Sequence, residues 1–237
     1  MAAKKTGSKK TAKSTGFAHP TLDDVRGFAG RLAQLRERFP KHAKAFAFDP
    51  LLDEAVVAEL EARECITLPA DYRTFLLHVG SSGGAWPMTG LQSPIEPLTQ
   101  TLYALRDPFP EPRSTDDSVM SMIGGLLPLG SDGSSTENAL VVSGPAHGQV
   151  WTYLEEDRPG WVPLLGGEPH ALDGRPLKKL KEKERELEIN SVLADLNRPL
   201  RHSFASVFST FLARCERGEL DELPTVFDAD DDDEWEP

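Results

Sequence analysis

Histidine and cysteine are side chains often used for catalysis and metal binding. In this chain of 237 residues they lie far apart in the sequence. Its cysteines, Cys65 and Cys215, each fall near the end of a separate amphipathic segment. No HExxH motif or zinc-type spacing joins them to the histidines, which are His19, His42, His78, His147, His170 and His202. We predict no catalytic residue, metal site or cofactor, and therefore no enzyme, and we expect Cys65 to pack as a small apolar side chain.

Two loops have compositions that could bind a ligand. The sequence "SDGSSTEN" (131–138) is rich in oxygen donors, but it lacks the alternating acids and flanking helices of an EF-hand, which favours an ordinary turn. The sequence "GSSGG" (80–84) follows a helical pattern instead of preceding one and has no Walker lysine, so a phosphate site is disfavoured. We expect Gly80 to close that helix in the left-handed conformation and the loop to lead into a sheet.

The formal net charge of −12 is unevenly distributed. Lysines dominate residues 1–15 and acids dominate residues 216–237. We predict a disordered basic tail over 1–18, one domain over 19–217 and a disordered acidic tail over 218–237. The acidic run could hold a cationic partner or only aid solubility. Because no aromatic residue interleaves the lysines, we expect no direct nucleic-acid binding. The chain lacks a long apolar stretch, which predicts a cytoplasmic protein without membrane contact.

Helical periodicity marks both ends of the predicted domain. A first helix should begin at Thr21 with a capping box, and a second should follow Asp49 and Pro50. The segment "LPADYRTFLLHVGSSGG" (68–84) predicts a third helix, because Tyr72, Phe75, Leu76 and Val79 share one face. The last helix should be capped by Ser203. Its apolar stripe comprises Phe204, Val207, Phe208, Phe211, Leu212 and Cys215.

The sequence between these helices has the texture of short strands and turns. We predict antiparallel strands over 126–129, 139–142 and 149–154, and a further strand over 161–165. Residues 98–124 are predicted to form a long connection with little regular structure, and residues 174–201 a charged helical insertion. The predicted fold class is α+β, with an antiparallel-rich sheet, flanking N-terminal and C-terminal helices and flexible tails around a single domain.

The order of four motifs resembles the SUKH superfamily, in particular its branch related to the fungal Smi/Knr cell-wall assembly regulator. The resemblance covers about 51–215. It is carried first by Leu68, Pro69, Tyr72, Phe75 and Leu76 in the third helix. It continues with Pro128, Gly130, Asp132 and Gly133, then Gly148 and Val150, and finally Ser203, Phe204, Phe211 and Leu212. The chain departs from the family pattern at Gly80 and Ser81, where the family usually has Asn-Gly.

The resemblance implies binding to another protein without catalysis. Many bacterial members are immunity proteins that inhibit polymorphic or contact-dependent toxins, often nucleases or deaminases, whereas fungal relatives act as signalling hubs. A regulatory or scaffolding protein that recruits partners through its tails and charged helix is therefore the alternative. We predict that Trp86, Asp132 and Glu137 contribute to a partner-binding surface, because an accessible tryptophan beside acids suits a cationic toxin. The oligomeric state is left open.

Overall fold

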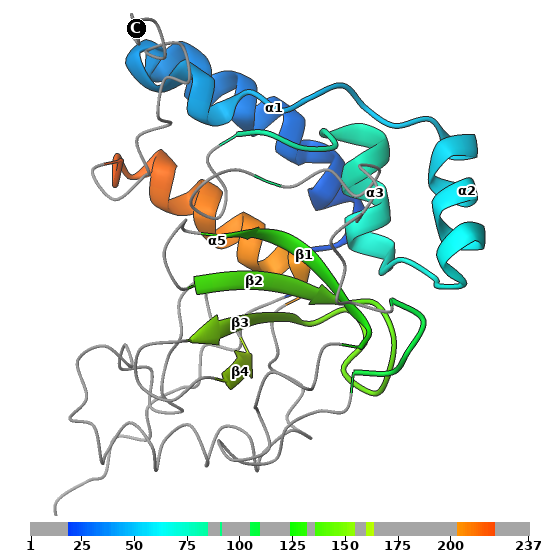
Figure 1. Ribbon diagram of the computed structural model, residues 1–237. Helices are drawn as coiled ribbons and strands as arrows, with labels where there is room; N and C mark the ends of the chain where they lie inside the picture. The colour runs from blue at the N-terminus through cyan, green and yellow to red at the C-terminus, as the bar shows by residue number, and fades with distance from the viewer. Residues whose placement is uncertain are drawn as a thin grey trace, which may run out of the picture.

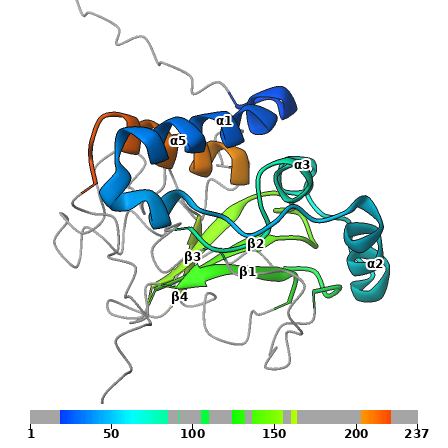
Figure 2. The same ribbon diagram turned by 90° about the horizontal axis from the view of Figure 1, so that it is seen from above.

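The computed structural model describes residues 19–84, 91, 105–109, 124–131, 136–154, 160–163 and 203–220. They form α1 (Leu22–Arg38), the 3₁₀-helix η1 (Pro40–Phe46), α2 (Glu54–Glu64), α3 (Ala70–His78), β1 (Leu126–Ser131), β2 (Thr136–Val141), β3 (Val150–Leu154), β4 (Gly160–Pro163) and α5 (Phe204–Glu216). Helices α1, α3 and α5 lie on one side of the sheet, and α2 stands at the edge of the molecule beside α3 (Figures 1 and 2).

The predicted α+β class is confirmed: along the chain, the strands of the sheet follow the N-terminal helices and precede α5. The predicted basic tail, most of the acidic tail, most of the 98–124 excursion and the charged segment 174–201 lie outside the described residues. Within the described part of the chain, no helix is both long enough and apolar enough to cross a bilayer.

Helix α1 begins at the predicted capping box. The Asp24 N–H donates to Thr21 Oγ1 at 3.2 Å, and the Thr21 N–H donates to Asp24 Oδ2 at 2.7 Å. Its buried face comprises Val25, Phe28, Leu32 and Leu35. This stripe packs against α3 and α5, so burial of apolar surface adds to the local capping in stabilising the helix.

The predicted apolar face of α3 is confirmed, because Tyr72, Phe75 and Leu76 are all fully buried. The predicted role of Gly80 is wrong. Val79 caps the helix with φ −122° and ψ −52°, and Gly80 is not left-handed. A glycine is required there for a different reason, since a Cβ at this position would collide with the Cβ of Phe48. Close approach of two backbone segments, and not helix termination, explains this glycine.

Helix α2 ends at Cys65, which takes the left-handed conformation with φ 55° and ψ 43°. Its side chain is exposed, so the prediction that Cys65 packs in the interior is wrong. The physical reason is its place on the helix surface: Ala58 and Ala62, seven and three residues earlier, are also exposed. Cys215, by contrast, is buried in the core as expected.

The four strands form one antiparallel sheet in the order β1-β2-β3-β4. Their bounds agree with the predicted strands to within a few residues. Leu127 pairs with Leu140, and Leu140 pairs with Val150, which places these three side chains on the face that joins the helical core. A register shift between Pro128 and Gly130 bends β1.

The opposite face of the sheet carries a second buried apolar group. Ala139 pairs with Trp151, and both are buried. The Phe109 ring meets Trp151 edge-on, with centroids 4.9 Å apart. Phe109 is held there by a hydrogen bond from its N–H to the Ser143 carbonyl at 2.9 Å. Trp151 is therefore a core residue of this face of the sheet.

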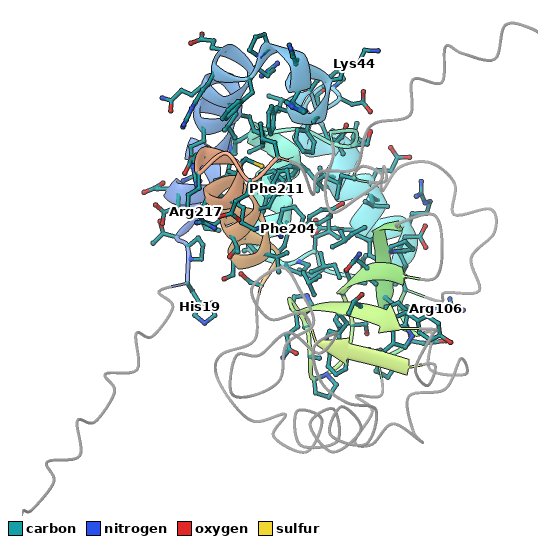
Figure 3. The ribbon with its side chains drawn as sticks, turned by 90° about the vertical axis from the view of Figure 1, so that its left-hand side faces the viewer. His19, Lys44, Arg106, Phe204, Phe211 and Arg217 are labelled. Atoms are coloured by element: carbon teal, nitrogen blue, oxygen red, sulfur yellow. The ribbon has the colours of Figure 1, made fainter. Side chains whose placement is uncertain are left out.

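Helix α5 is attached to α3 at its N-terminus. Ser203 caps it as predicted, because its Oγ accepts from the Ser206 N–H at 3.3 Å. Asp71 of α3 also accepts from the Ala205 N–H at 2.9 Å. A carboxylate there satisfies unpaired amides and complements the helix dipole. Phe204 then contacts Tyr72 and Phe75 with ring centroids 4.8 and 5.0 Å apart, on the inward side of α5 (Figure 3).

Candidate protein-binding surface

An extended segment, 47–52, joins η1 to α2, and we call it the strap. Hydrogen bonds to the end of α3 and the loop after it fix its backbone. The Asp49 N–H donates to the Ser82 carbonyl at 2.8 Å, and the Leu52 N–H donates to the Leu76 carbonyl at 3.0 Å. Between them, Ser81 Oγ donates to the Pro50 carbonyl at 2.8 Å. The backbone on both sides of Leu51 is therefore held in one conformation.

The side chain of Leu51 is 54% exposed, the highest value among the large hydrophobic side chains that the structure describes. It begins an apolar row that continues along the outer side of α2. The other members of the row, all exposed, are Ala55, Ala58, Ala62 and Cys65. We call these five residues the Leu51 face. Ala55, Ala58 and Ala62 lie within α2, where their spacing of three and four residues keeps them on one side of the helix, whereas Leu51 lies in the strap before α2 and Cys65 is its C-terminal cap.

The inner side of α2 is apolar as well. Val57 and Leu60 are buried, and α2 packs against α3. A helix with apolar residues on both sides is unusual at a protein surface, where the outer side is normally polar. Alanine side chains are short, so they would let a second helix approach closely. The outer side of α2 therefore has the composition of a contact surface.

Carboxylates border the Leu51 face. Glu54 and Glu61 share one cationic partner, Arg73, which donates to Glu54 Oε2 at 3.0 Å and to Glu61 Oε2 at 3.4 Å and so offsets one of their two charges. The hydrogen bond from Arg73 also holds the pKa of Glu54 below its usual range. Asp53 and Glu59 are exposed and form no ion pair with any described residue. They leave the border of the face negatively charged.

The predicted partner-binding residues are only partly described. Trp86 and Asp132 lie outside the described residues, so their nearness to one another stays a prediction. Glu137 lies in β2, opposite Ser131 of β1 and Tyr153 of β3, and the structure describes its backbone only. Trp161 of β4 is buried, so it is not available as an exposed interface residue.

Sequence reasoning missed the Leu51 face, although its spacing is visible in the sequence. In the sequence, Leu52, Val56 and Leu60 lie about one turn apart and mark a single apolar side of this segment. In the structure, Val57 and Leu60 are the buried pair, while the row from Leu51 to Cys65 faces solvent. A search for two separate apolar rows in one helix would have found it.

Among the histidines that the structure describes, His147 makes a structural contact. It lies in the turn between β2 and β3, and its Nε2 is 2.8 Å from the Thr67 carbonyl, just before α3. Among the described residues, no group of three histidine, cysteine, aspartate or glutamate side chains could hold a metal ion. The part of the site that the geometry does define is an exposed apolar surface with an acidic border.

These features define an α+β domain whose distinctive surface suits binding to a protein. Residues 51–164 match the SMI1 / KNR4 family (SUKH-1), and this match supports the assignment of the segment to the SUKH superfamily. The match begins at Leu51 and ends just after β4, so α1, η1 and α5 lie outside it, whereas the sequence resemblance extended to about residue 215. No curated protein gives a significant match to the chain.

Proposed function

We propose that this protein is a cytoplasmic, non-catalytic binding module that acts as an immunity protein, and that it inhibits a cationic toxin by covering it with the Leu51 face. The observation that carries the proposal is the exposed Leu51 on a fixed backbone, followed by an exposed alanine row. Membership of residues 51–164 in the SUKH superfamily supports the class of function.

The geometry suits tight binding for two physical reasons. An apolar anchor that is already ordered costs less conformational entropy on association than a mobile one. The unpaired carboxylates of Asp53 and Glu59 would attract a basic partner and orient it, which mainly raises the association rate. Inhibition would follow from steric occlusion, so no turnover is required. Trp86, Asp132 and Glu137 could extend the same surface, and this remains a prediction.

The test uses the protein encoded by the adjacent gene, which we expect to be toxic when produced alone. Co-production of the full chain should restore growth, and the two proteins should form a complex whose affinity falls as salt rises. Leu51→Glu should weaken that affinity at least about tenfold. Glu59→Lys should slow association with a smaller effect on dissociation.

Two matched variants serve as controls. Leu22→Glu changes the other large hydrophobic side chain that is exposed among the described residues, which lies on α1, and Glu37→Lys reverses an exposed charge on the same helix. Both should bind like the wild type. Equal loss of affinity in Leu22→Glu and Leu51→Glu would reject the Leu51 face. A wild-type chain that binds no toxic neighbour would reject the immunity role and favour the regulatory alternative.

A further inference from the structure

Phe48 of the strap is a half-buried member of the central aromatic cluster. Its ring meets Phe75 of α3 and Phe208 of α5 with centroids 5.7 and 5.8 Å apart. Both partners are fully buried, whereas Phe48 is only half-buried. The strap that presents Leu51 is thus anchored to the core three residues earlier, through a side chain at the boundary with solvent.

The loop 80–84 encloses the other side of this ring. A Cβ at Gly84 would lie 2.5 to 2.9 Å from three carbons of the Phe48 ring, and Gly84 has φ +63°. Gly83 lies between Gly80 and Gly84 in the loop, and it pairs with Phe48 in an antiparallel bridge. Side chains at 80 or 84 would occupy the space of the ring or of its Cβ, so this loop is shaped around Phe48.

We propose that the 80–84 loop is a clasp for Phe48 that controls the Leu51 face. With the ring seated, the hydrogen bonds of Asp49 and Leu52 hold the strap and present Leu51. With the ring released, the strap loses its anchor and the Leu51 face loses its fixed geometry. The proposal rests on the proposed function, because it concerns regulation of the same surface.

The clasp is placed to open before the rest of the fold. Local opening is least costly where few apolar contacts are broken and the hydrogen bonds lie near solvent. Release of one half-buried ring meets the first condition, because Phe75, Phe204 and Phe208 keep their mutual contacts. The hydrogen bond of Asp49 meets the second, because Asp49 is exposed. By linkage, a partner that binds only the ordered face would also favour the closed clasp, although it need not touch the glycines.

Amide hydrogen exchange of the full chain, followed residue by residue, tests the clasp without any partner. Gly84→Ala inserts one methyl group at the ring and should speed exchange of the Asp49 and Leu52 amides at least about tenfold. Amides within α1 and α5 should exchange at the wild-type rate. Gly27→Ala, which adds a methyl in open space on α1, should leave the strap unchanged.

Unchanged exchange of the Asp49 and Leu52 amides in Gly84→Ala would overturn the clasp. So would equal acceleration across α1, α3 and α5, because that pattern means global destabilisation. If Gly84→Ala does not fold, Phe48→Leu removes the ring and keeps an apolar side chain, and it carries the same expectation. These outcomes are independent of the binding experiment, so failure of the immunity role and failure of the clasp are distinguishable.

Discussion

The ring of Tyr72 stabilises the core, whereas its buried hydroxyl destabilises it. Its ring packs edge-on against Phe204 with centroids 4.8 Å apart, yet its hydroxyl is buried and has no hydrogen-bond partner among the described residues. An unpaired buried hydroxyl is unfavourable. Tyr72→Phe should therefore raise the free energy of unfolding by about 1 kcal/mol, measured by urea denaturation. Tyr72→Ala should lower it by about 3 to 5 kcal/mol, because it removes the ring.

The pH dependence of unfolding offers a second measurement on the same residue. Burial raises the pKa of the Tyr72 hydroxyl above its usual value of about 10. The folded state then keeps the proton while the unfolded state loses it, so stability falls as pH rises above about 10. Tyr72→Phe has no hydroxyl that could ionise on unfolding. Its free energy of unfolding should therefore exceed that of the wild type by a larger amount above about pH 10 than at neutral pH. A lower stability of Tyr72→Phe at neutral pH would show that the hydroxyl has a partner.

At the scale of elements, α1 is a helix whose sequence does not maximise its own stability. Gly27 and Gly30 lie within it, and a Cβ at either position would meet nothing within 4 Å. Glycine inside a helix costs about 0.5 to 1 kcal/mol relative to alanine. Gly27→Ala and Gly30→Ala should each raise the unfolding free energy by that amount in urea denaturation.

The opposite result is expected at Gly125, before β1, and this contrast tests the reasoning. Gly125 has φ +70°, and a Cβ there would lie 2.7 Å from backbone atoms of Asp107, Phe109 and Ser143. Gly125→Ala should lower the unfolding free energy, since rigid backbone cannot yield easily. Similar effects of Gly27→Ala and Gly125→Ala would contradict this account.

The ion pair between α1 and α5 predicts an acid-sensitive helix contact. Arg31 donates from Nε and Nη2 to the two carboxylate oxygens of Glu216, at 2.6 and 2.9 Å. These bonds lower the pKa of Glu216, so its contribution is present at neutral pH and is lost as pH falls through the folded-state pKa. The Glu216 side chain is 42% exposed, which screens the pair and limits its worth to about 0.5 kcal/mol.

Glu216→Gln should therefore lower the unfolding free energy at neutral pH, and its deficit relative to wild type should shrink towards about pH 3. Urea denaturation at several pH values measures the deficit. Glu37→Gln changes an exposed residue on α1 and is the control. Its free energy of unfolding should change with pH in the same way as that of the wild type. A deficit of Glu216→Gln that is constant with pH would mean that packing, and not charge, links the helices.

The sequence allowed the helices and strands to be placed because their signals are periodic and local. The capping box at Thr21 and the buried face of α3 follow from residues a few positions apart. Gly80 was misread because its neighbour, Phe48, is distant in sequence and no local pattern reveals it. The exposure of Cys65 and the Leu51 face depend on which side of α2 meets α3, which is a tertiary fact.

At the scale of the whole molecule, both edge strands of the sheet that the described residues form contain proline. The edge strands are β1 and β4, which carry Pro128 and Pro163 respectively. Proline cannot donate a ladder hydrogen bond, and the register shift after Pro128 further disturbs the edge. These features disfavour addition of a strand from another chain. The exposed helical surface of α2 is therefore better suited to a protein partner than either sheet edge.

The fold of the whole chain also extends beyond the family segment, which predicts that residues 51–164 do not fold independently. Within this segment, Tyr72, Phe75 and Leu76 are buried, but much of what covers them comes from outside it. Phe204 and Phe208 of α5 both contact Phe75, and Phe28 of α1 contacts Phe208. A fragment of 51–164 would expose these large apolar side chains to water.

We expect the isolated 51–164 fragment to aggregate or to show no cooperative unfolding by near-ultraviolet circular dichroism, because side-chain packing would be lost before backbone structure. A fragment of 19–220 retains every described contact and should unfold cooperatively. The comparison separates two explanations of the family boundary. A cooperative transition in 51–164 would mean that α1 and α5 are additions to a self-sufficient domain, whereas its absence would mean that they complete the domain's core.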